Sequence, residues 1–174
     1  HRDLHSFPTR RSSDLDYATQ NGAHVINMSF GGYGFSQAVY DVCAAAGDAG
    51  ILISAAAGNA GNDNDTQPAY PASYDLENII SVAATTNQDL PAGFTNYGKI
   101  SVDLAAPGES IYSCGISADD DYATESGTSM AAPHVAGIMA LMRSLQPSWT
   151  VLQLREKILA AVDPLPSLKD TTVT

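Results

Sequence analysis

The sequence has few basic residues and many acidic ones. Lysine and arginine together number 8, aspartate and glutamate number 19, and the formal net charge is −11. Binding to nucleic acid needs a basic face for the phosphates, so this balance argues against nucleic acid as a partner. We interpret the acidity as the solvated surface of a soluble globular protein.

Long apolar runs and cysteines are also scarce. No uninterrupted apolar run approaches the ~20 residues that span a bilayer, so we expect no membrane partner. The two cysteines, Cys43 and Cys114, have no metal-ligand spacing and are too few for a disulfide framework. A bond between the two stays open as an alternative. The 174 residues suffice for one domain with a hydrophobic core.

A serine at the start of an apolar helix is the feature around which the chain is organised. Gly127 permits a tight turn, Pro133 is expected in the first turn of the helix, and apolar residues continue at helical spacing to Leu145. Ser129 would then lie where free backbone N–H groups and the positive end of the helix dipole suit a developing oxyanion. The alternative is that Ser129 only caps the helix.

Three ordered motifs resemble those of the subtilisin-like serine proteases, the subtilases. They read Val-Ile-Asn-Met-Ser-Phe-Gly-Gly at 25–32, Ala-Ala-Ala-Gly-Asn-Ala-Gly at 55–61 and Gly-Thr-Ser-Met-Ala-Ala-Pro-His-Val-Ala-Gly at 127–137. The resemblance covers about residues 16–163. It implies a three-layer α/β fold with a mostly parallel central sheet, of which this chain would be an incomplete part. It also implies a serine endopeptidase that works through an acyl-enzyme.

The resemblance assigns roles to individual residues of this chain. Ser129 is the nucleophile, and the Asn59 side chain and the Ser129 backbone N–H donate to the oxyanion. The substrate-binding residues it implies are Ser29, Phe30, Gly31, Ala56, Ala57, Gly58, Ala69 and Thr128. Because most of these side chains are small, we expect room for a large apolar substrate side chain.

No histidine in the sequence matches the family's base. His134 follows Ser129 by five positions, about 140° around a helix, and His24 precedes a strand. Neither has the Asp-Thr-Gly or His-Gly-Thr-His surroundings of the family's acid and base, which precede the asparagine and serine in the subtilase order. We therefore expect the acid and the base to lie upstream of residue 16, so that this fragment is inactive. We also expect that the chain does not fold stably alone, because strand edges stay unpaired.

The first residues differ in character from the rest. Residues 1–15 are basic and polar, with neither a helical nor a strand period. Residues 3–15 resemble the translation of a common sequencing adapter, so we interpret 1–15 as an artefact outside the fold. A natural basic arm is the alternative. The division that follows is a partial catalytic domain at 16–163 and a tail without clear structure at 164–174.

Hydrophobic periodicity and turn residues predict alternating strands and helices. A strand, a helix capped by Ser36 and a second strand make one right-handed βαβ unit. The last predicted helix carries an apolar stripe of Leu152, Ile158, Leu159 and Val162. The resemblance implies a cis Tyr70–Pro71 bond. The predicted strands are 25–30, 51–56, 79–85, 102–105 and 109–113. The predicted helices are 37–49, 150–162 and one from near 129 to near 145, and residues 16–21 are predicted to be the end of an earlier helix.

No cofactor is required by the predicted chemistry, but the resemblance implies a weak cation site. Its candidate ligands are the carbonyl groups of Ala72 and Tyr74 and the carboxylate of Asp103. Oxygen ligands of this kind would suit structural Ca²⁺ or Na⁺. The inserted residues 75–78 weaken the correspondence with the family here.

Two other functions remain as alternatives. A nucleotide-binding protein would need Gly-x-Gly-x-x-Gly before a helix, and Gly58 and Gly61 do not supply that pattern. A catalytically dead, subtilase-like module that binds peptides is the closer alternative, although retention of Ser129 and Asn59 argues against it. The resemblance implies a polypeptide substrate and a monomeric, secreted parent protein.

Overall fold

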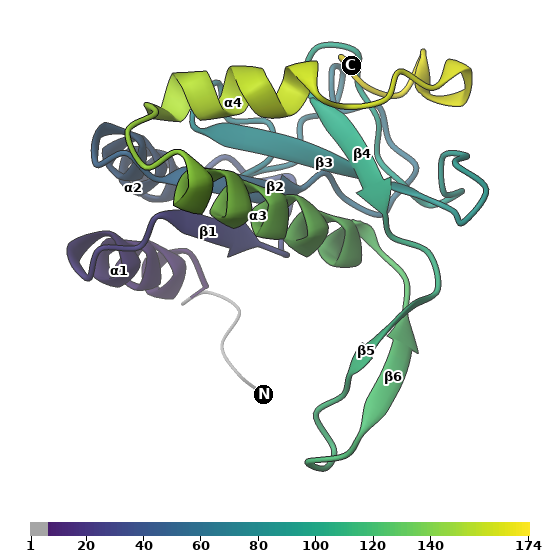
Figure 1. The fold of residues 1–174 in the computed structure, drawn as a ribbon, viewed down its shortest axis with the longest axis horizontal. Helices are drawn as coiled ribbons and strands as arrows, with labels where there is room; N and C mark the ends of the chain where they lie inside the picture. Colours follow the sequence, from purple (N-terminus) through teal and green to yellow (C-terminus); the bar gives the residue numbers. More distant parts are fainter. Residues whose placement is uncertain (1–6) are drawn as a thin grey trace.

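The computed structural model describes residues 7–174 (Figure 1). Four parallel strands form the central sheet in the order β1-β2-β3-β4. Their bounds are Val25–Met28 for β1, Leu52–Ala56 for β2, Ile79–Thr85 for β3 and Leu104–Pro107 for β4. Ser54 in the second strand pairs with Asn27 on one side and Ile80 on the other. The predicted parallel sheet is confirmed.

The two inner strands are buried over their whole length, whereas β1 and β4 are partly exposed. Along β2, Leu52 and Ala56 face one core cluster, while Ile53 and Ala55 face the other. A strand that is buried on both faces needs a continuous apolar run rather than alternation. This explains why the sequence predicted the bounds of β3 without error and those of its neighbours to within a few residues.

Helices cover both faces of the sheet and make the three layers (Figure 1). The helices α1 (Phe7–Gln20) and α2 (Gln37–Asp48) supply one core cluster, and α3 (Thr128–Leu145) and α4 (Val151–Ala160) supply the other. The Ser54 hydroxyl donates to the Ala132 carbonyl at 2.8 Å and ties the sheet to α3. The predicted three-layer α/β fold is therefore confirmed.

Local capping fixes where the helices begin. The Ser36 side chain accepts from the Val39 N–H, as predicted. Thr150 and Gln153 form a reciprocal capping box at the start of α4. The stripe on α4 differs from the prediction, because Leu152 is exposed. Leu154, which lies four positions before the buried Ile158, packs in the core instead.

The structure differs from the sequence-based expectation at both ends of the described chain. Helix α1 begins at Phe7, inside the segment expected to lie outside the fold, and Leu15 is buried against α2. The origin of residues 1–15 as an adapter stays a prediction. In the tail, a short 3₁₀ helix spans Pro166–Leu168, and the Val173 N–H donates to the Val102 carbonyl at 2.8 Å. The end of the tail therefore pairs with the segment that leads into β4.

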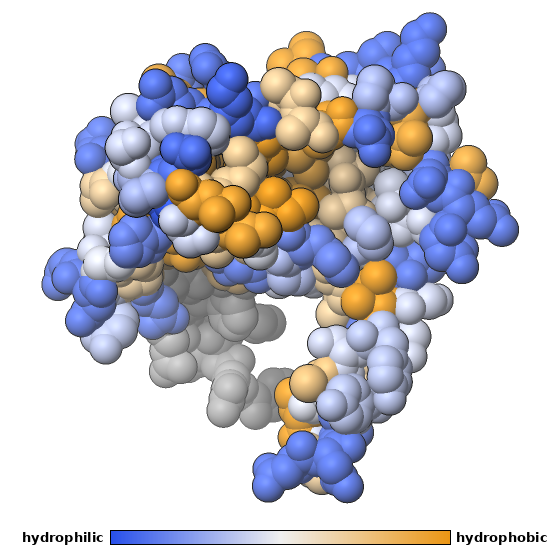
Figure 2. All heavy atoms as spheres, viewed as in Figure 1, coloured by the Kyte–Doolittle hydropathy of each residue, from blue (hydrophilic) through white to orange (hydrophobic). Residues whose placement is uncertain are grey.

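A hairpin extends away from the layered body (Figure 1). Its strands are β5 (Ile111–Cys114) and β6 (Tyr122–Glu125), paired antiparallel. The second strand was not predicted, because Tyr-Ala-Thr-Glu is short, polar and almost fully exposed. On the body itself, Figure 2 shows apolar residues gathered over α3, where Ile138, Leu141 and Leu145 are exposed. Apolar patches of this kind usually contact another segment or partner.

Two further predictions can be compared with the structure. The Tyr70–Pro71 peptide bond is cis, as the resemblance implied. Cys43 is buried in α2 and Cys114 is exposed on the hairpin, and both are free thiols. The alternative of a disulfide between them is therefore wrong.

Candidate active site

The candidate nucleophile lies in the first turn of α3. Gly127 precedes the helix, and Thr128 and Ser129 are its first two residues. The Ser129 hydroxyl donates to the Ser29 carbonyl at 3.1 Å, and the Ser29 hydroxyl donates to the Ser129 carbonyl at 2.7 Å. This reciprocal pair joins the start of α3 to the segment that follows β1.

Pro133 explains why the Ser129 carbonyl is free for that contact. The proline lies in the second turn of α3, not in the first as predicted. In an α-helix the residue four positions after Ser129 would donate its N–H to the Ser129 carbonyl, and proline has no N–H. The Ser29 hydroxyl takes the vacant acceptor, so the proline is compensated by a side chain from another element.

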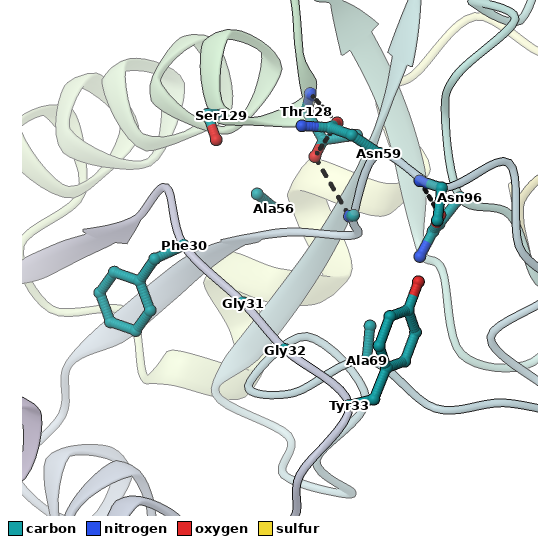
Figure 3. Close-up of a pocket in the computed structure, with 12 residues that line it drawn as sticks. Phe30, Gly31, Gly32, Tyr33, Ala56, Asn59, Ala69, Asn96, Thr128 and Ser129 are labelled. Carbon is teal, nitrogen blue, oxygen red and sulfur yellow. Dashed lines mark hydrogen bonds between the residues drawn. The ribbon is translucent and has the colours of Figure 1, made fainter. Parts of the chain in front are cut away.

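Asn59 follows β2 and is fixed beside α3 by its carbonyl oxygen. Asn59 Oδ1 accepts from the Thr128 N–H at 2.8 Å and from Thr128 Oγ1 at 2.9 Å (Figure 3). Thr128 Oγ1 also accepts from the Gly58 N–H at 3.1 Å. A Cβ at Gly127 would lie 3.1 Å from Asn59 Nδ2, so glycine there lets the amide approach. Because both bonds use Oδ1, the amide N–H groups remain available to a ligand.

Asn96 holds the loop that carries Asn59, and sequence analysis missed it. Its Oδ1 accepts from the N–H groups of Ala60 and Asn62 at 2.8 and 3.1 Å. Its Nδ2 donates to the Ala57 carbonyl at 3.1 Å and to Asn64 Oδ1 at 3.0 Å. The Asn96 side chain is completely buried. Both polar atoms of the Asn96 side chain are thus hydrogen-bonded within the loop and fix its shape.

The Asn96 side chain also leaves no room for a side chain at position 58, which is glycine. Its φ is +117°, which disfavours a side chain, and a Cβ there would overlap the Asn96 amide group. In the sequence, Asn96 stands in a Thr-Asn-Tyr-Gly stretch that resembles an ordinary turn. Nothing in that local pattern signals a contact with residues more than thirty positions away.

A cavity of about 260 Å³ opens beside Ser129 (Figure 3). Most of the predicted substrate-binding residues line it, together with four that were not predicted. The predicted residues are Phe30, Gly31, Ala56, Gly58, Ala69 and Thr128, and the additional ones are Gly32, Tyr33, Ala60 and Asn96. We call this space the acyl cavity.

Two predicted substrate-binding residues do not line the acyl cavity. Ala57 is completely buried below it, and its carbonyl accepts from Asn64 and Asn96. Ser29 contacts Ser129 rather than the cavity. Ala57 differs from its neighbours Ala56 and Gly58 because successive side chains of an extended segment point in opposite directions. A role for Ala57 and Ser29 in substrate binding stays a prediction.

Neither His24 nor His134 contacts the Ser129 hydroxyl. His134 Nδ1 lies 2.8 Å from the Met130 carbonyl on the same helix, in agreement with a structural interpretation. His24 stands just before β1, whereas Ser29 follows that strand at its other end. The hydroxyl of Ser129 bonds the Ser29 carbonyl instead. Within residues 7–174, the site thus has a serine and an amide, and no imidazole is hydrogen-bonded to the serine hydroxyl.

The candidate cation ligands share a cavity of about 460 Å³, but the carboxylate in it is already engaged. Ala72, Tyr74 and Asp103 all line this cavity. Asp103 Oδ1 pairs with Arg155 at 2.6 Å, and its Oδ2 accepts from the Ser81 N–H at 2.8 Å. Burial raises the pKa of Asp103, and Arg155 and the Ser81 bond oppose that shift. The guanidinium therefore occupies the place of a cation at this carboxylate, and the residues fit a bound metal poorly.

The other acidic residues show no gathering that would suit a metal. Among residues 7–174, no group of three or more His, Cys, Asp or Glu side chains is placed to hold one. In the same range, no helix combines the length and the apolarity that crossing a membrane requires.

The fold and the site together define a class of protein. A parallel sheet lies between helical layers, a serine begins a helix at the carboxyl ends of the strands, and an amide is fixed beside it. This is an α/β fold that places a serine hydroxyl and an amide donor side by side. A sequence model of the subtilase family matches residues 9–173. The chain belongs to the subtilase family.

Individual relatives agree with that assignment. Subtilisin DY of Bacillus licheniformis is 40% identical over 147 residues, which are 84% of this chain and 52% of that protein. Thermitase of Thermoactinomyces vulgaris is 43% identical over 136 residues, 78% of this chain and 46% of that protein. The chain thus spans about half the length of these curated relatives.

Solved structures give the same result for the fold. The crystal structure of a cold-adapted subtilisin-like serine proteinase superposes with a TM-score of 0.82 at 35% identity. The match covers 95% of this chain and 59% of that one. The family and the fold that the three motifs predicted are both confirmed.

Proposed function

We propose that this chain carries the nucleophile and oxyanion half of a serine endopeptidase site. The observation that supports it most directly is the anchoring of Asn59 by its Oδ1 to Thr128, beside Ser129. That anchoring turns the amide donor toward a ligand and costs no reorganisation when charge develops. A module that only binds peptides would have no need of a donor held in this way.

In the proposed reaction, Ser129 Oγ attacks the carbonyl carbon of the scissile peptide bond. The carbonyl oxygen becomes an oxyanion, which accepts from Asn59 Nδ2 and from the Ser129 N–H, a free donor in the first turn of α3. The C–N bond then breaks, and the proton taken from the serine passes to the departing amine. Water hydrolyses the resulting ester and restores the serine.

The proton acceptor is proposed to come from a part of the subtilase domain outside this chain. Two observations support this: no described histidine contacts Ser129, and the chain spans about half the length of its relatives. The exposed apolar side chains on α3, the helix that carries Ser129, supply a surface for such a part. On its own, the chain is expected to be inactive.

An extended polypeptide is the proposed substrate. The acyl cavity is walled by small residues and by the ring of Tyr33, which favours a large apolar side chain just before the scissile bond. We also propose a monomeric, extracellular parent protein that binds no nucleic acid or membrane, because the relatives are bacterial subtilisins and the chain is acidic. Any structural Ca²⁺ of the parent would lie elsewhere than at Asp103.

A chimera tests the proposal. Residues 16–174 replace the matched part of Subtilisin DY, and hydrolysis of casein and of a chromogenic peptide is measured. We expect the chimera to be active, the Ser129→Ala variant to be inactive, and the Ser144→Ala control on the same helix to keep its activity. A chimera that unfolds cooperatively yet hydrolyses no faster than its Ser129→Ala variant would overturn the proposal.

A further inference from the structure

Ser129 lies on the wall between two cavities. The acyl cavity is on one side, and a second cavity of about 440 Å³ lies between α3 and the hairpin β5–β6 on the other. Tyr112, Glu125, Met130 and His134 line this second space, which we call the hairpin cavity. Ser129 is the residue that both cavities share.

The position of the hairpin cavity determines which part of a substrate it meets. This step rests on the proposed function, in which the scissile carbonyl stands at Ser129 Oγ. If the residues before the scissile bond occupy the acyl cavity, then the residues after it pass over the opposite side of Ser129. The hairpin cavity therefore receives the side of the substrate that leaves as the amine.

The charge around the hairpin cavity has one sign. Glu125 is its only carboxylate, is exposed, and makes no ion pair among the described residues. The other ionisable groups that face it are His134, whose Nδ1 is engaged by Met130, and the phenol of Tyr112 and thiol of Cys114. The sequence has no lysine or arginine between Lys99 and Arg143, so the hairpin carries no fixed cation. Arg143, the one cation of α3, lies in the last turn of the helix, where its guanidinium donates to the Gly50 and Trp149 carbonyls.

An aromatic surface stands on the same hairpin. The rings of Tyr112 and Tyr122 stack with centroids 5.3 Å apart, and both side chains are exposed. Because Tyr112 also lines the hairpin cavity, an alkyl stem that ends in a cation can pack on its ring while the charge meets a carboxylate. Lysine and arginine side chains have this form.

We propose that Glu125 makes the leaving-group side of the site selective for lysine or arginine directly after the scissile bond. A glutamate that faces a partly enclosed space attracts a cationic side chain and disfavours an acidic one. Glu125 thus contributes to specificity without taking part in the chemistry of Ser129.

Peptide binding to the Ser129→Ala form of the chimera, which is expected not to hydrolyse the peptides, tests this. Fluorescent peptides that share an apolar residue before the scissile bond carry Lys, Gln or Glu directly after it, and anisotropy gives their Kd values. We expect the lysine peptide to bind about two- to fivefold more tightly than the glutamine peptide, because an exposed ion pair contributes an affinity gain of about this size. The preference should shrink as salt is raised.

Variants connect the preference to Glu125. Glu125→Gln should abolish it, and Glu125→Lys should reverse it in favour of the glutamate peptide. Glu156→Gln, which removes the same charge from an exposed site on α4, should leave it unchanged. Equal affinities for all three peptides in the chimera that keeps Glu125 would overturn the inference but leave the proposed function standing, whereas failure of a cooperatively folded chimera to bind any of them would overturn both.

Discussion

Asn59 Oδ1 accepts two hydrogen bonds from Thr128, one from its backbone N–H and one from its hydroxyl. Asn59, in the loop after β2, is thereby fixed to the first residue of α3, although 69 positions separate the two residues in the sequence. The candidate donor and the candidate nucleophile consequently move as one unit. Their relative position depends on a threonine that itself touches no reacting atom in the proposed mechanism.

Thr128→Ala should therefore lower the turnover of the active chimera. The substitution removes one bond to Asn59 Oδ1 and leaves the Gly58 N–H without its acceptor. We expect kcat to fall roughly fivefold, the rate equivalent of about 1 kcal/mol for one hydrogen bond, with KM nearly constant. Thr128→Ser keeps the hydroxyl and should retain most of the activity.

Asn59→Ala sets the scale for that measurement. In subtilisin itself, removal of the oxyanion asparagine costs about 10²–10³ in kcat. Thr128→Ala should fall between this variant and the unmodified chimera. A Thr128→Ala variant whose KM rises while kcat is unchanged would contradict a positioning role.

Ser29→Ala should destabilise the protein because of Pro133. The Ser129 carbonyl would lose its donor, and the proline cannot supply an N–H in its place. We expect a loss of about 1–2 kcal/mol in the free energy of unfolding, typical of a part-buried polar group left unpaired. Urea unfolding of the chimera would measure it.

A double-mutant cycle separates this cause from a general helix effect. Pro133→Ala restores an N–H, so it should stabilise the Ser29→Ala background by about 1 kcal/mol more than it stabilises the unmodified one. Equal gains in the two backgrounds would mean that the Ser29 hydroxyl does not compensate for the proline.

The sequence predicted the elements of the fold correctly where a local pattern determines the structure. The continuous apolar run of β3 and the serine cap of α2 were predicted correctly, because burial on both faces and side-chain capping act within a few residues. The placement of Asn59 and Ser129 in one site followed from resemblance, since the sequence itself separates them by two strands and a hairpin.

What sequence reasoning missed depends on contacts between distant residues. Asn96 gives no local signal because its partners lie 32 to 39 positions away, and β6 is too polar and short to be recognised apart from its partner strand. The early start of α1 was missed because the helix has little apolar periodicity. Among residues 12–20, the part of α1 whose side chains the structure describes, Leu15 is the one in the core cluster shared with α2.

The two cysteines should differ strongly in reactivity in the folded chain. Cys43 is completely buried in α2, and burial raises the pKa of its thiol to about 12, whereas Cys114 is exposed. Because the thiolate is the reactive form, we expect a disulfide reagent to modify Cys114 at once and Cys43 only after denaturant is added. The Cys114→Ser variant isolates the slow reaction.

The rate at Cys43 also reports whether the isolated chain keeps its fold. Slow modification would mean that α2 stays packed on the sheet in the chain alone. Prompt modification in the chain, with protection in the chimera, would agree instead with the sequence-based expectation that open strand edges prevent stable folding.

Asp65 should make the stability depend on pH in the acid range. Its Oδ1 accepts from the Ser101 hydroxyl at 2.7 Å and from the Ser101 N–H at 2.9 Å, and its carboxylate also accepts from the Ile100 N–H. Burial alone would raise the pKa of Asp65, but these hydrogen bonds outweigh it and hold the pKa below the ordinary value of 3.8. The folded state therefore favours the ionised form.

The sign of the effect follows from that shift. The stabilisation is complete at pH values above 3.8 and is lost as the pH falls through the lowered folded-state pKa of Asp65. Asp65→Asn should thus lower the urea midpoint of the chimera at pH 6 and change it much less at pH 2. Asp170→Asn removes an exposed partner of Lys99 and should have little effect at pH 6. A deficit of Asp65→Asn that is equally large at both pH values would show that its cause is lost packing, since lost packing does not depend on ionisation.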